Sequence, residues 1–322
     1  MGTIDVFNGD ADGICALHQW RLAWPAQSTL VTGVKRDINL LKGLEAGAGD
    51  VLTVFDISFD SNRADALRLL AAGAKLRWFD HHFAGEPVDH PALEASIDTS
   101  PEICTSLLVD KALGGAYRAW AVTAAFGDNL HASARQAAAG LGLTAEELES
   151  LAELGELLNY NGYGDSVADL HVAPADLYRQ MAGYADPLVF MAECPVFVRL
   201  RAGFAADMKA AEAVRPCLED ALAAAWLLPD AAWARRVIGV MANRLALAAP
   251  DRAHALLVPN ASGTLTVSVR APRNRPDGAD QLCRRFATGG GRKAAAGINR
   301  LPSGETGAFL REFSGFFNQR GG

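Results

Sequence analysis

Short apolar runs alternate with amphipathic stretches over the first 80 residues, which predicts strands and helices in turn. The predicted strands are residues 4–7, 29–34, 51–55 and 75–79. Helices are expected over 14–20 and 61–72, where Leu and Ala recur at helical spacing. Strands that alternate with helices indicate a parallel α/β sheet, in which ligands bind beyond the carboxyl ends of the strands.

The chain becomes rich in Ala and Leu from about residue 103, which predicts mostly helical structure to about 184. Ser100 and Pro101 offer an N-cap and a first helical residue for this segment. A further helical stretch is expected to continue to about Leu228, since loops of that length are rare in compact proteins.

Three more strands are predicted after this stretch, with a hairpin turn at 260–263 between the last two. These strands are residues 237–240, 255–258 and 264–269. The expected fold class is α/β: a parallel-sheet domain over 1–185, a helical connector over 186–230, and a smaller α/β domain over 231–322.

The net charge of −7 argues against a protein coated in nucleic acid, but the charge is unevenly distributed. Residues 270–300 hold eight basic and two acidic side chains, so this segment carries +6 and the rest of the chain −13. The five scattered cysteines contain no CxxC pair, which favours reduced thiols over a zinc-thiolate site. No apolar run reaches the roughly 18 residues of a membrane helix, so we expect a cytoplasmic chain without a membrane partner.

Four short segments place acidic or imidazole side chains after a predicted strand or at a helix end. They are NGDADG (8–13), FDIS (55–58), WFDHH (78–82) and FGDN (126–129). Two carboxylates 4 Å apart repel by roughly 4 kcal/mol at an effective dielectric of about 20, so carboxylates that meet here need cations or protons between them. Carboxylates with imidazoles and no thiolate favour Mn²⁺ first, with Mg²⁺, Co²⁺ or Zn²⁺ as competitors.

Each segment alone also fits an ordinary structural role. Asp12 could belong to a turn and helix cap, Asp56 could cap the following helix, and Asp128 could be a turn residue. The run Asp80-His81-His82 is harder to explain as a hydrogen-bonded loop. The four segments together, in this order, favour a metal site over these separate roles.

The four segments resemble the signature motifs of the DHH phosphoesterase superfamily, which includes RecJ exonucleases, oligoribonuclease/pAp phosphatases, cyclic-dinucleotide phosphodiesterases and family II pyrophosphatases. The resemblance implies two metal ions, Mn²⁺ or alternatively Mg²⁺ or Co²⁺. It assigns Asp10 and Asp56 to one ion and makes Asp56 a bridge to the other. The implied ligands of this other ion are Asp12, Asp56, His81 and Asp128. Asp80, His81 and His82 form the implied catalytic group, in which Asp80 orients or supplements His81 and His82 faces the scissile phosphate.

The segment RRFATGGGRKAAAGIN (284–299) resembles the GGGHxxAAG motif of the DHHA1 domain. Glycines at 289–291 let backbone amides approach a phosphate before a small-residue helix expected at 294–296. The resemblance implies further substrate contacts from Arg270 and His82, and the basic segment would complement an acidic, metal-loaded cleft. The full predicted substrate-binding set is Asn8, His82, Arg270, Gly289, Gly290, Gly291, Arg292 and Lys293.

Two positions depart from the family pattern. Many members carry His four residues before the first Asp, where this chain has Val6, and Asn8 stands two residues before Asp10. The family His of GGGH is Arg292 here, followed by Lys293, which favours an electrostatic clamp over a titrating imidazole. These departures bear on how one metal is held and on which substrate is bound.

The leading functional hypothesis is a two-metal hydrolase, a nucleotide phosphoesterase or exonuclease with a nucleic-acid-binding site, acting on small nucleotides or short single-stranded oligonucleotides between the two domains. One alternative is a phosphomonoesterase or pyrophosphatase for a small non-nucleotide phosphate. Another is a catalytically impaired nucleotide sensor. A homodimer could form through the sheet edge or the connector, and no residue in the sequence decides this.

Overall fold

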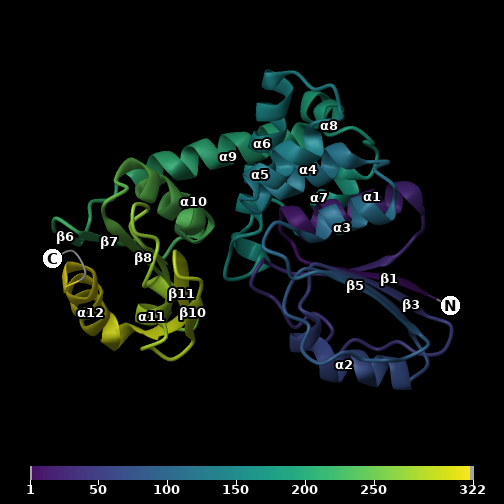
Figure 1. Ribbon diagram of the computed structural model, residues 1–322, viewed down its shortest axis with the longest axis horizontal. Coiled ribbons are helices and arrows are strands. Elements are labelled where there is room, and N and C mark those ends of the chain that lie inside the picture. Colours follow the sequence, from purple (N-terminus) through teal and green to yellow (C-terminus); the bar gives the residue numbers. More distant parts are fainter. Residues whose placement is uncertain (1, 320–322) are drawn as a thin grey trace. The chain divides into compact units, whose positions relative to one another are not determined.

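The computed structural model describes residues 2–319 of the chain. It divides into two compact units, one ending at Ala202 and one beginning at Gly203, and each unit contains its own sheet (Figure 1). The division falls inside the long helix α9 (Pro195–Glu212).

The first unit has a five-stranded sheet in the order β2-β1-β3-β4-β5, and every neighbouring pair is parallel. The strands are β1 (Thr3–Phe7), β2 (Thr29–Thr32), β3 (Val51–Phe55), β4 (Lys75–Asp80) and β5 (Leu93–Ile97). The predicted parallel sheet is therefore confirmed. The edge strand β5 was not expected, since its residues LEASI are mostly partly or fully exposed and lack a strong apolar pattern.

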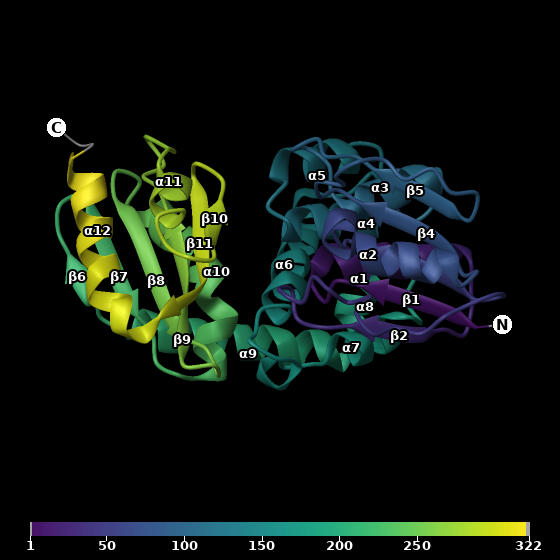
Figure 2. The same ribbon diagram turned by 90° about the horizontal axis from the view of Figure 1, so that it is seen from below.

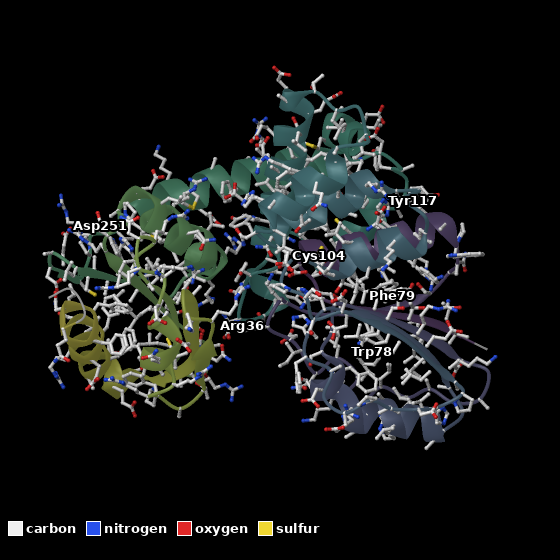
Figure 3. The ribbon with its side chains drawn as sticks, in the orientation of Figure 1. Arg36, Trp78, Phe79, Cys104, Tyr117 and Asp251 are labelled. Atoms are coloured by element: carbon white, nitrogen blue, oxygen red, sulfur yellow. The ribbon has the colours of Figure 1, made fainter. Side chains whose placement is uncertain are left out.

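Successive residues of the central strands face opposite layers of this unit. Val54 and Trp78 pack into the layer that contains α2 (Phe59–Ala71). Phe79 faces the other way from Trp78 (Figure 3). It contacts Trp20 of α1 (Ala11–Ala23), with ring centroids 5.3 Å apart. Both faces of the sheet are thus covered, as parallel sheets require.

The rest of the first unit is helical, as predicted. Its elements are α3 (Thr105–Ala112), α4 (Arg118–Gly127), α5 (His131–Ala138), α6 (Ala145–Asn161), the 3₁₀ turn η1 (Val167–Asp169), α7 (Pro174–Met181) and α8 (Pro187–Glu193). The prediction that Ser100 and Pro101 start a helix was wrong. The Ile103 amide donates to the Ser100 carbonyl at 3.1 Å and closes a turn, so that α3 begins only at Thr105.

The second unit has a six-stranded sheet in the order β10-β11-β9-β8-β7-β6. Figure 2 shows β10 and β11 side by side at one edge. The strands are β6 (Leu218–Glu219), β7 (Ala223–Leu227), β8 (Ala253–Pro259), β9 (Thr264–Arg270), β10 (Gly289–Gly291) and β11 (Ala295–Pro302). Only β7 and β8 pair in parallel, which makes this a mixed sheet.

Helices cover both faces of the second sheet. Four phenylalanines of α12 (Thr306–Gln319) pack with α11 (Ala279–Cys283) and alternate residues of β8 such as Ala255 and Leu257. The other helix of this unit is α10 (Ala232–Ala248), which packs on β8 and β9. The 3₁₀ turn η2 (Ser303–Glu305) precedes α12.

Three local predictions for this part of the chain were wrong. Residues 237–240 lie inside α10. A short run that is buried on all sides has no periodicity by which the sequence could separate helix from strand. The stretch up to Leu228 contains β6 and β7 instead of continuous helix, since its small residues pack within the sheet. Residues 294–296 belong to a turn and to β11, so the expected small-residue helix is absent from this described segment.

The cysteines are all free, and only Cys217 is exposed. Within residues 2–319, no helix combines the length and apolar character that a bilayer crossing requires.

Candidate metal centre

The loop between β1 and α1 is fixed by its own hydrogen bonds. Asp10 is the N-cap of α1, and its Oδ1 accepts from the amides of Asp12 and Gly13, each at 3.1 Å. A Cβ at Gly13 would lie 2.3 Å from the Asn8 carbonyl oxygen, so only glycine permits this close approach. The loop therefore presents Asp10 and Asp12 in set positions.

Asp12 joins this loop to the start of α3. Its Oδ2 accepts from the Thr105 amide and its Oδ1 from the Ser106 amide, both at 2.7 Å. The Ser106 hydroxyl donates to the Asp12 carbonyl at 2.8 Å. Asp12 thus caps the N-terminus of α3, although it lies 93 residues before Thr105 in the sequence. Its oxygens retain lone pairs that a cation could use.

Asp56 follows β3 in a left-handed backbone conformation, with φ of 58°. Such a residue costs about 1–3 kcal/mol unless its surroundings hold it in place. Its amide donates to the Phe79 carbonyl at 3.0 Å, and its Oδ1 accepts from the Thr105 hydroxyl at 3.2 Å. These contacts turn the buried carboxylate toward the loop that carries Asp12.

Asp80 is completely buried at the end of β4 and organises the two histidines after it. Its Oδ1 accepts from the amides of His81 at 2.9 Å and His82 at 3.2 Å, and from His82 Nδ1 at 2.7 Å. Its Oδ2 lies 3.4 Å from the Phe59 amide. Asp80 therefore orients His82 and is engaged by four donors.

His81 points one ring nitrogen at the carboxylates. Its Nδ1 lies 2.9 Å from the Ile103 carbonyl, which assigns the proton to Nδ1 and leaves Nε2 facing the cluster. Nε2 lies 3.4 Å from Asp56 Oδ1, 3.7 Å from Asp128 Oδ2 and 3.9 Å from Asp12 Oδ2. Three carboxylates from three separate segments thus meet around one imidazole.

Asp128 comes to this point as the C-cap of α4, in a turn where Asn129 has a φ of 61°. Its side chain is more exposed than those of Asp12 and Asp56. It approaches His81 through Oδ2 and Lys35 Nζ through Oδ1, the latter at 3.6 Å.

The protonation of the cluster reflects unbalanced negative charge. Burial raises the pKa of Asp56 well above its usual range, and the charges of Asp10 and Asp12 raise it further. The pKa of Asp12 is also raised, first by burial. Burial alone would lower the pKa of His81, but its hydrogen bond to Asp56 and the surrounding carboxylates raise it to about 10. A cation in the cluster would replace these protons.

The donor atoms suit a divalent ion. Donor atoms of Asp12, His81 and Asp128 lie within 4.8 Å of one another, and so do those of Asp56, His81 and His82. Carboxylate oxygens and imidazole nitrogens without thiolates are the ligands that Mn²⁺ and Mg²⁺ accept. The residues present therefore fit a hard divalent metal.

Lys35, after β2, is a member of the cluster that the sequence did not reveal. Its Nζ lies 2.5 Å from Asp10 Oδ2 and 2.9 Å from Asn159 Oδ1. Burial would lower the pKa of Lys35, but Asp10, with smaller contributions from Tyr163 and Asp128, raises it well above its ordinary value. The sequence signal for Lys35 is its position just after the carboxyl end of β2, the same kind of position that Asp56 has after β3.

Thr105, Ser106 and Asn159 were also missed. They follow no motif, and their role comes from the packing of α3 and α6 against the loop that carries Asp10.

Asn8 lies at the edge of this cluster. Its Nδ2 donates to the Lys35 carbonyl at 3.2 Å. Its Oδ1 is buried and has no hydrogen-bond partner among the described residues. Val6, two residues earlier, is fully buried in the core and offers no donor atom.

The predicted substrate contacts of the second unit gather at one end of its sheet. Arg270 ends β9, where Nε donates to Asn243 Oδ1 at 2.8 Å and one terminal nitrogen to the Ser268 hydroxyl at 3.0 Å. Arg270 pairs in register with Ala295, which exchanges two backbone hydrogen bonds with Arg292. The Gly289–Gly291 run is thus an edge strand of a hairpin, with Arg292 and exposed Lys293 at its tip.

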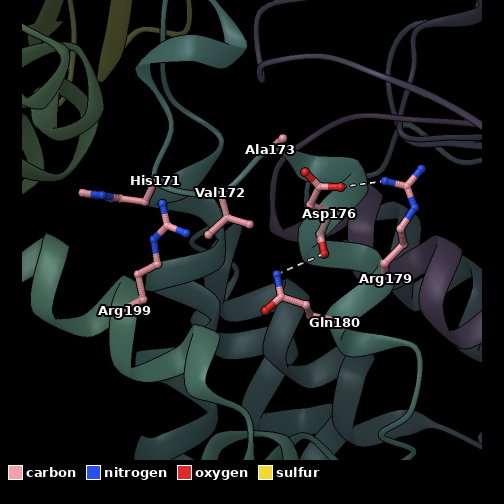
Figure 4. A pocket seen from close by; sticks show the side chains of 7 residues that line it. All are labelled: His171, Val172, Ala173, Asp176, Arg179, Gln180 and Arg199. Atoms are coloured by element: carbon pink, nitrogen blue, oxygen red, sulfur yellow. Dashed lines mark hydrogen bonds and ion pairs between the residues drawn. The ribbon is translucent and has the colours of Figure 1, made fainter.

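A surface pocket of about 540 Å³ in the first unit contains none of the predicted site residues (Figure 4). Its lining consists of His171, Val172, Ala173, Asp176, Arg179, Gln180 and Arg199. Arg179 is paired with Asp176 at 2.6 Å, and the Gln180 amide donates to the Asp176 carbonyl. Its chemistry is separate from that of the carboxylate cluster.

No protein-family model and no curated protein sequence matches the chain. Solved structures do match it along nearly its whole length. A manganese-bound RecJ exonuclease is 18% identical, with a TM-score of 0.64, over 98% of this chain and 90% of that one. RecJ from Thermus thermophilus in complex with Mn²⁺ is 19% identical, with a TM-score of 0.61, over 98% of this chain and 52% of that one.

The pGpG-specific phosphodiesterase PggH from Vibrio cholerae is 11% identical, with a TM-score of 0.54, over 99% of both chains. At these identities the likeness shows the fold. The chain has the two-domain fold of DHH/DHHA1 proteins, and the predicted fold class is confirmed.

Proposed function

We propose that this chain is a metal-dependent phosphoesterase that hydrolyses phosphoester bonds in small nucleotides or short single-stranded oligonucleotides. The observation that carries the proposal is the meeting of Asp12, Asp56 and Asp128 around Nε2 of His81. The likeness to RecJ and PggH supports phosphoester chemistry on nucleotides.

The proposed metal is Mn²⁺, with Mg²⁺ or Co²⁺ as alternatives, held by Asp12, Asp56, His81 and Asp128. When bound, such an ion lowers the pKa of water and neutralises charge on the phosphoryl group. The capping bonds from Thr105 and Ser106 fix Asp12 before any ligand arrives. The Ile103 carbonyl fixes the His81 ring in the same way.

His82 is the proposed phosphate-contacting residue. Its Nδ1 is held by Asp80, so Nε2 is the nitrogen left to meet a ligand, and its side chain is 45% exposed. Asp80 acts as a positioning residue in this scheme because it fixes the tautomer and orientation of the ring. The unpartnered Oδ1 of Asn8 supplies an acceptor for a bound substrate or water.

We further propose that the first unit is catalytic and the second binds substrate. The proposed substrate-binding residues of the second unit are Arg270, Gly289, Gly290, Gly291, Arg292 and Lys293. A glycine edge strand lets a phosphate approach the backbone closely, and a guanidinium group suits phosphate oxygens.

The test is a substrate panel with Mn²⁺ and Mg²⁺ compared, from inorganic pyrophosphate through pAp and cyclic dinucleotides to short RNAs. We expect Mn²⁺-dependent release of a nucleoside monophosphate or phosphate from a nucleotide substrate. Asp56→Ala should abolish this turnover, whereas Asp89→Ala, a change of an exposed aspartate in the same unit, should leave it intact. Full activity of Asp56→Ala would refute the metal assignment, and turnover of pyrophosphate alone would favour a non-nucleotide phosphatase.

A nucleotide sensor without turnover is the second candidate. The observation that favours it is the ion pair between Lys35 and Asp10, which occupies one of the predicted ligands. It predicts saturable nucleotide binding in calorimetry, without product after hours in Mn²⁺.

A further inference from the structure

The carboxylate cluster has two unlike sides. On one side, Nε2 of His81 lies among the carboxylates of Asp12, Asp56 and Asp128. On the other side, Asp10 faces an ammonium group, Lys35 Nζ. This difference bears on how many metal ions the cluster can hold.

The two candidate positions for an ion share one imidazole lone pair, that of His81 Nε2. The two groups of donor atoms that could hold an ion, Asp12-His81-Asp128 and Asp56-His81-His82, have His81 in common. His81 Nδ1 is committed to the Ile103 carbonyl, so its single remaining nitrogen can ligate one ion. His82 Nδ1 is likewise committed to Asp80. The two groups therefore compete for a ligand, and they describe alternative positions for one ion.

Asp10 has little capacity left for a second ion. Its Oδ1 accepts from two backbone amides, and its Oδ2 accepts from Lys35 Nζ at 2.5 Å. Neither group of candidate donors contains Asp10. The neighbouring side chains add no charge, since Val6 is apolar and Asn8 carries a neutral amide.

Several contacts fix the position of the Lys35 ammonium group. Its ammonium also donates to Asn159 Oδ1 at 2.9 Å and lies 3.6 Å from Asp128 Oδ1. The ring of Tyr163 lies 5.6 Å from Nζ, which adds a cation–π contact. One positive charge therefore lies among Asp10, Asn159 and Asp128, with a defined position.

We propose that Lys35 is a built-in cation of this centre, so that the chain binds one divalent ion at Asp12, Asp56, His81 and Asp128 and neutralises Asp10 with an ammonium group. The inference rests on the proposed metal site, and it revises the two ions predicted from the sequence to one. Its chemical consequence is that a bound phosphate would meet two cations, the divalent ion and the Lys35 ammonium group. A chelator could remove only the first.

The test counts ions in the substrate-free protein. Equilibrium dialysis against Mn²⁺ should give one tightly bound ion per chain, and electron paramagnetic resonance should show an isolated Mn²⁺ without exchange coupling. Two ions of similar affinity, or a spin-coupled pair, in the unaltered protein would overturn the proposal. Because this measurement needs no variant, it stands even where a substitution prevents folding.

A double variant tests the part played by the lysine. Asn8→Asp with Lys35→Met removes the ammonium and adds a carboxylate beside Asp10, so it should raise the stoichiometry from one ion to two and produce the coupled spectrum. Lys42→Met, a change of an exposed lysine in the same unit, should keep one ion. A folded double variant that still binds a single ion at saturating Mn²⁺ would show that Lys35 does not hold the second position.

These outcomes separate the inference from the proposed function. One bound ion without hydrolysis of any substrate would refute the function and leave the inference intact. Two bound ions with hydrolysis of a nucleotide substrate would refute the inference and leave the proposed function intact.

Discussion

The acidic cluster of the first unit and the basic end of the second sheet, both proposed to contact phosphate, are built in different ways. The carboxylates of Asp12 and Asp56 are almost fully buried and held by hydrogen bonds from other segments. Arg292 and Lys293 are exposed at a hairpin tip. Burial fixes the positions of the carboxylates but raises the free energy of their charges. Exposure to water stabilises the charges of Arg292 and Lys293 but leaves their side chains without a fixed position. A substitution should therefore act very differently in the two places.

The largest expected effect lies within the buried cluster. Asp12→Asn places an amide group against two backbone donors, so at least one donor loses its acceptor, at a cost of about 1–3 kcal/mol. We expect Mn²⁺ affinity to fall by at least about 100-fold and the melting temperature in EDTA to fall by roughly 5 °C.

Asp128→Asn is the matched control for this change. Asp128 is more exposed, and its side chain makes ionic contacts with Lys35 and His81. It should lose metal affinity at nearly unchanged melting temperature. Equal destabilisation by the two substitutions would contradict the distinction between a capping ligand and a plain ligand.

An intermediate effect on activity is expected at Arg270, the charged side chain of the second unit that hydrogen bonds hold in position. Asn243 and Ser268 hold the Arg270 guanidinium, so Arg270→Ala should raise KM by about 10- to 100-fold, the value of a lost charge-assisted hydrogen bond. Mn²⁺ affinity should stay the same, and Arg270→Lys should restore little because the planar fork is lost. Kinetics at fixed, saturating Mn²⁺ measure this, and an unchanged KM would remove Arg270 from the substrate site.

The smallest effect is expected at the hairpin tip. Arg292→Ala and Lys293→Ala should each raise KM by about 2- to 5-fold at low ionic strength, since exposed charges contribute little and salt screens them. The effect should vanish in high salt, and Arg311→Ala, in the same unit, should show none. A salt-independent loss of activity would mean that the tip is fixed in the bound state.

The sequence predicted well what depends on strand ends. Asp56 and Asp80 follow apolar runs that alternate with a predicted helix, as strands of a parallel sheet do, so their placement at one edge of the sheet followed from topology. Lys35 obeys the same rule, but a lysine after a strand is usually a solvated residue, and nothing local marks its contact with Asp10.

Errors were concentrated where tertiary packing decides local structure. Three of the four residues at 237–240 are β-branched and the segment is still helical, because α10 is buried along most of its length. Residues 294–296 looked like a helix of small residues and instead pair with β9, where small side chains fit a crowded sheet. Capping of α3 by Asp12 could not be predicted either, since the two lie 93 residues apart.

The left-handed backbone at Asp56 sets the stability of the turn against the proposed metal binding. Glycine adopts this conformation without penalty, so the residue that best suits the turn is one that cannot hold an ion. The stability of the turn favours glycine at position 56, whereas the proposed metal binding requires aspartate. Asp56→Gly should therefore relieve the turn and at the same time remove a proposed metal ligand.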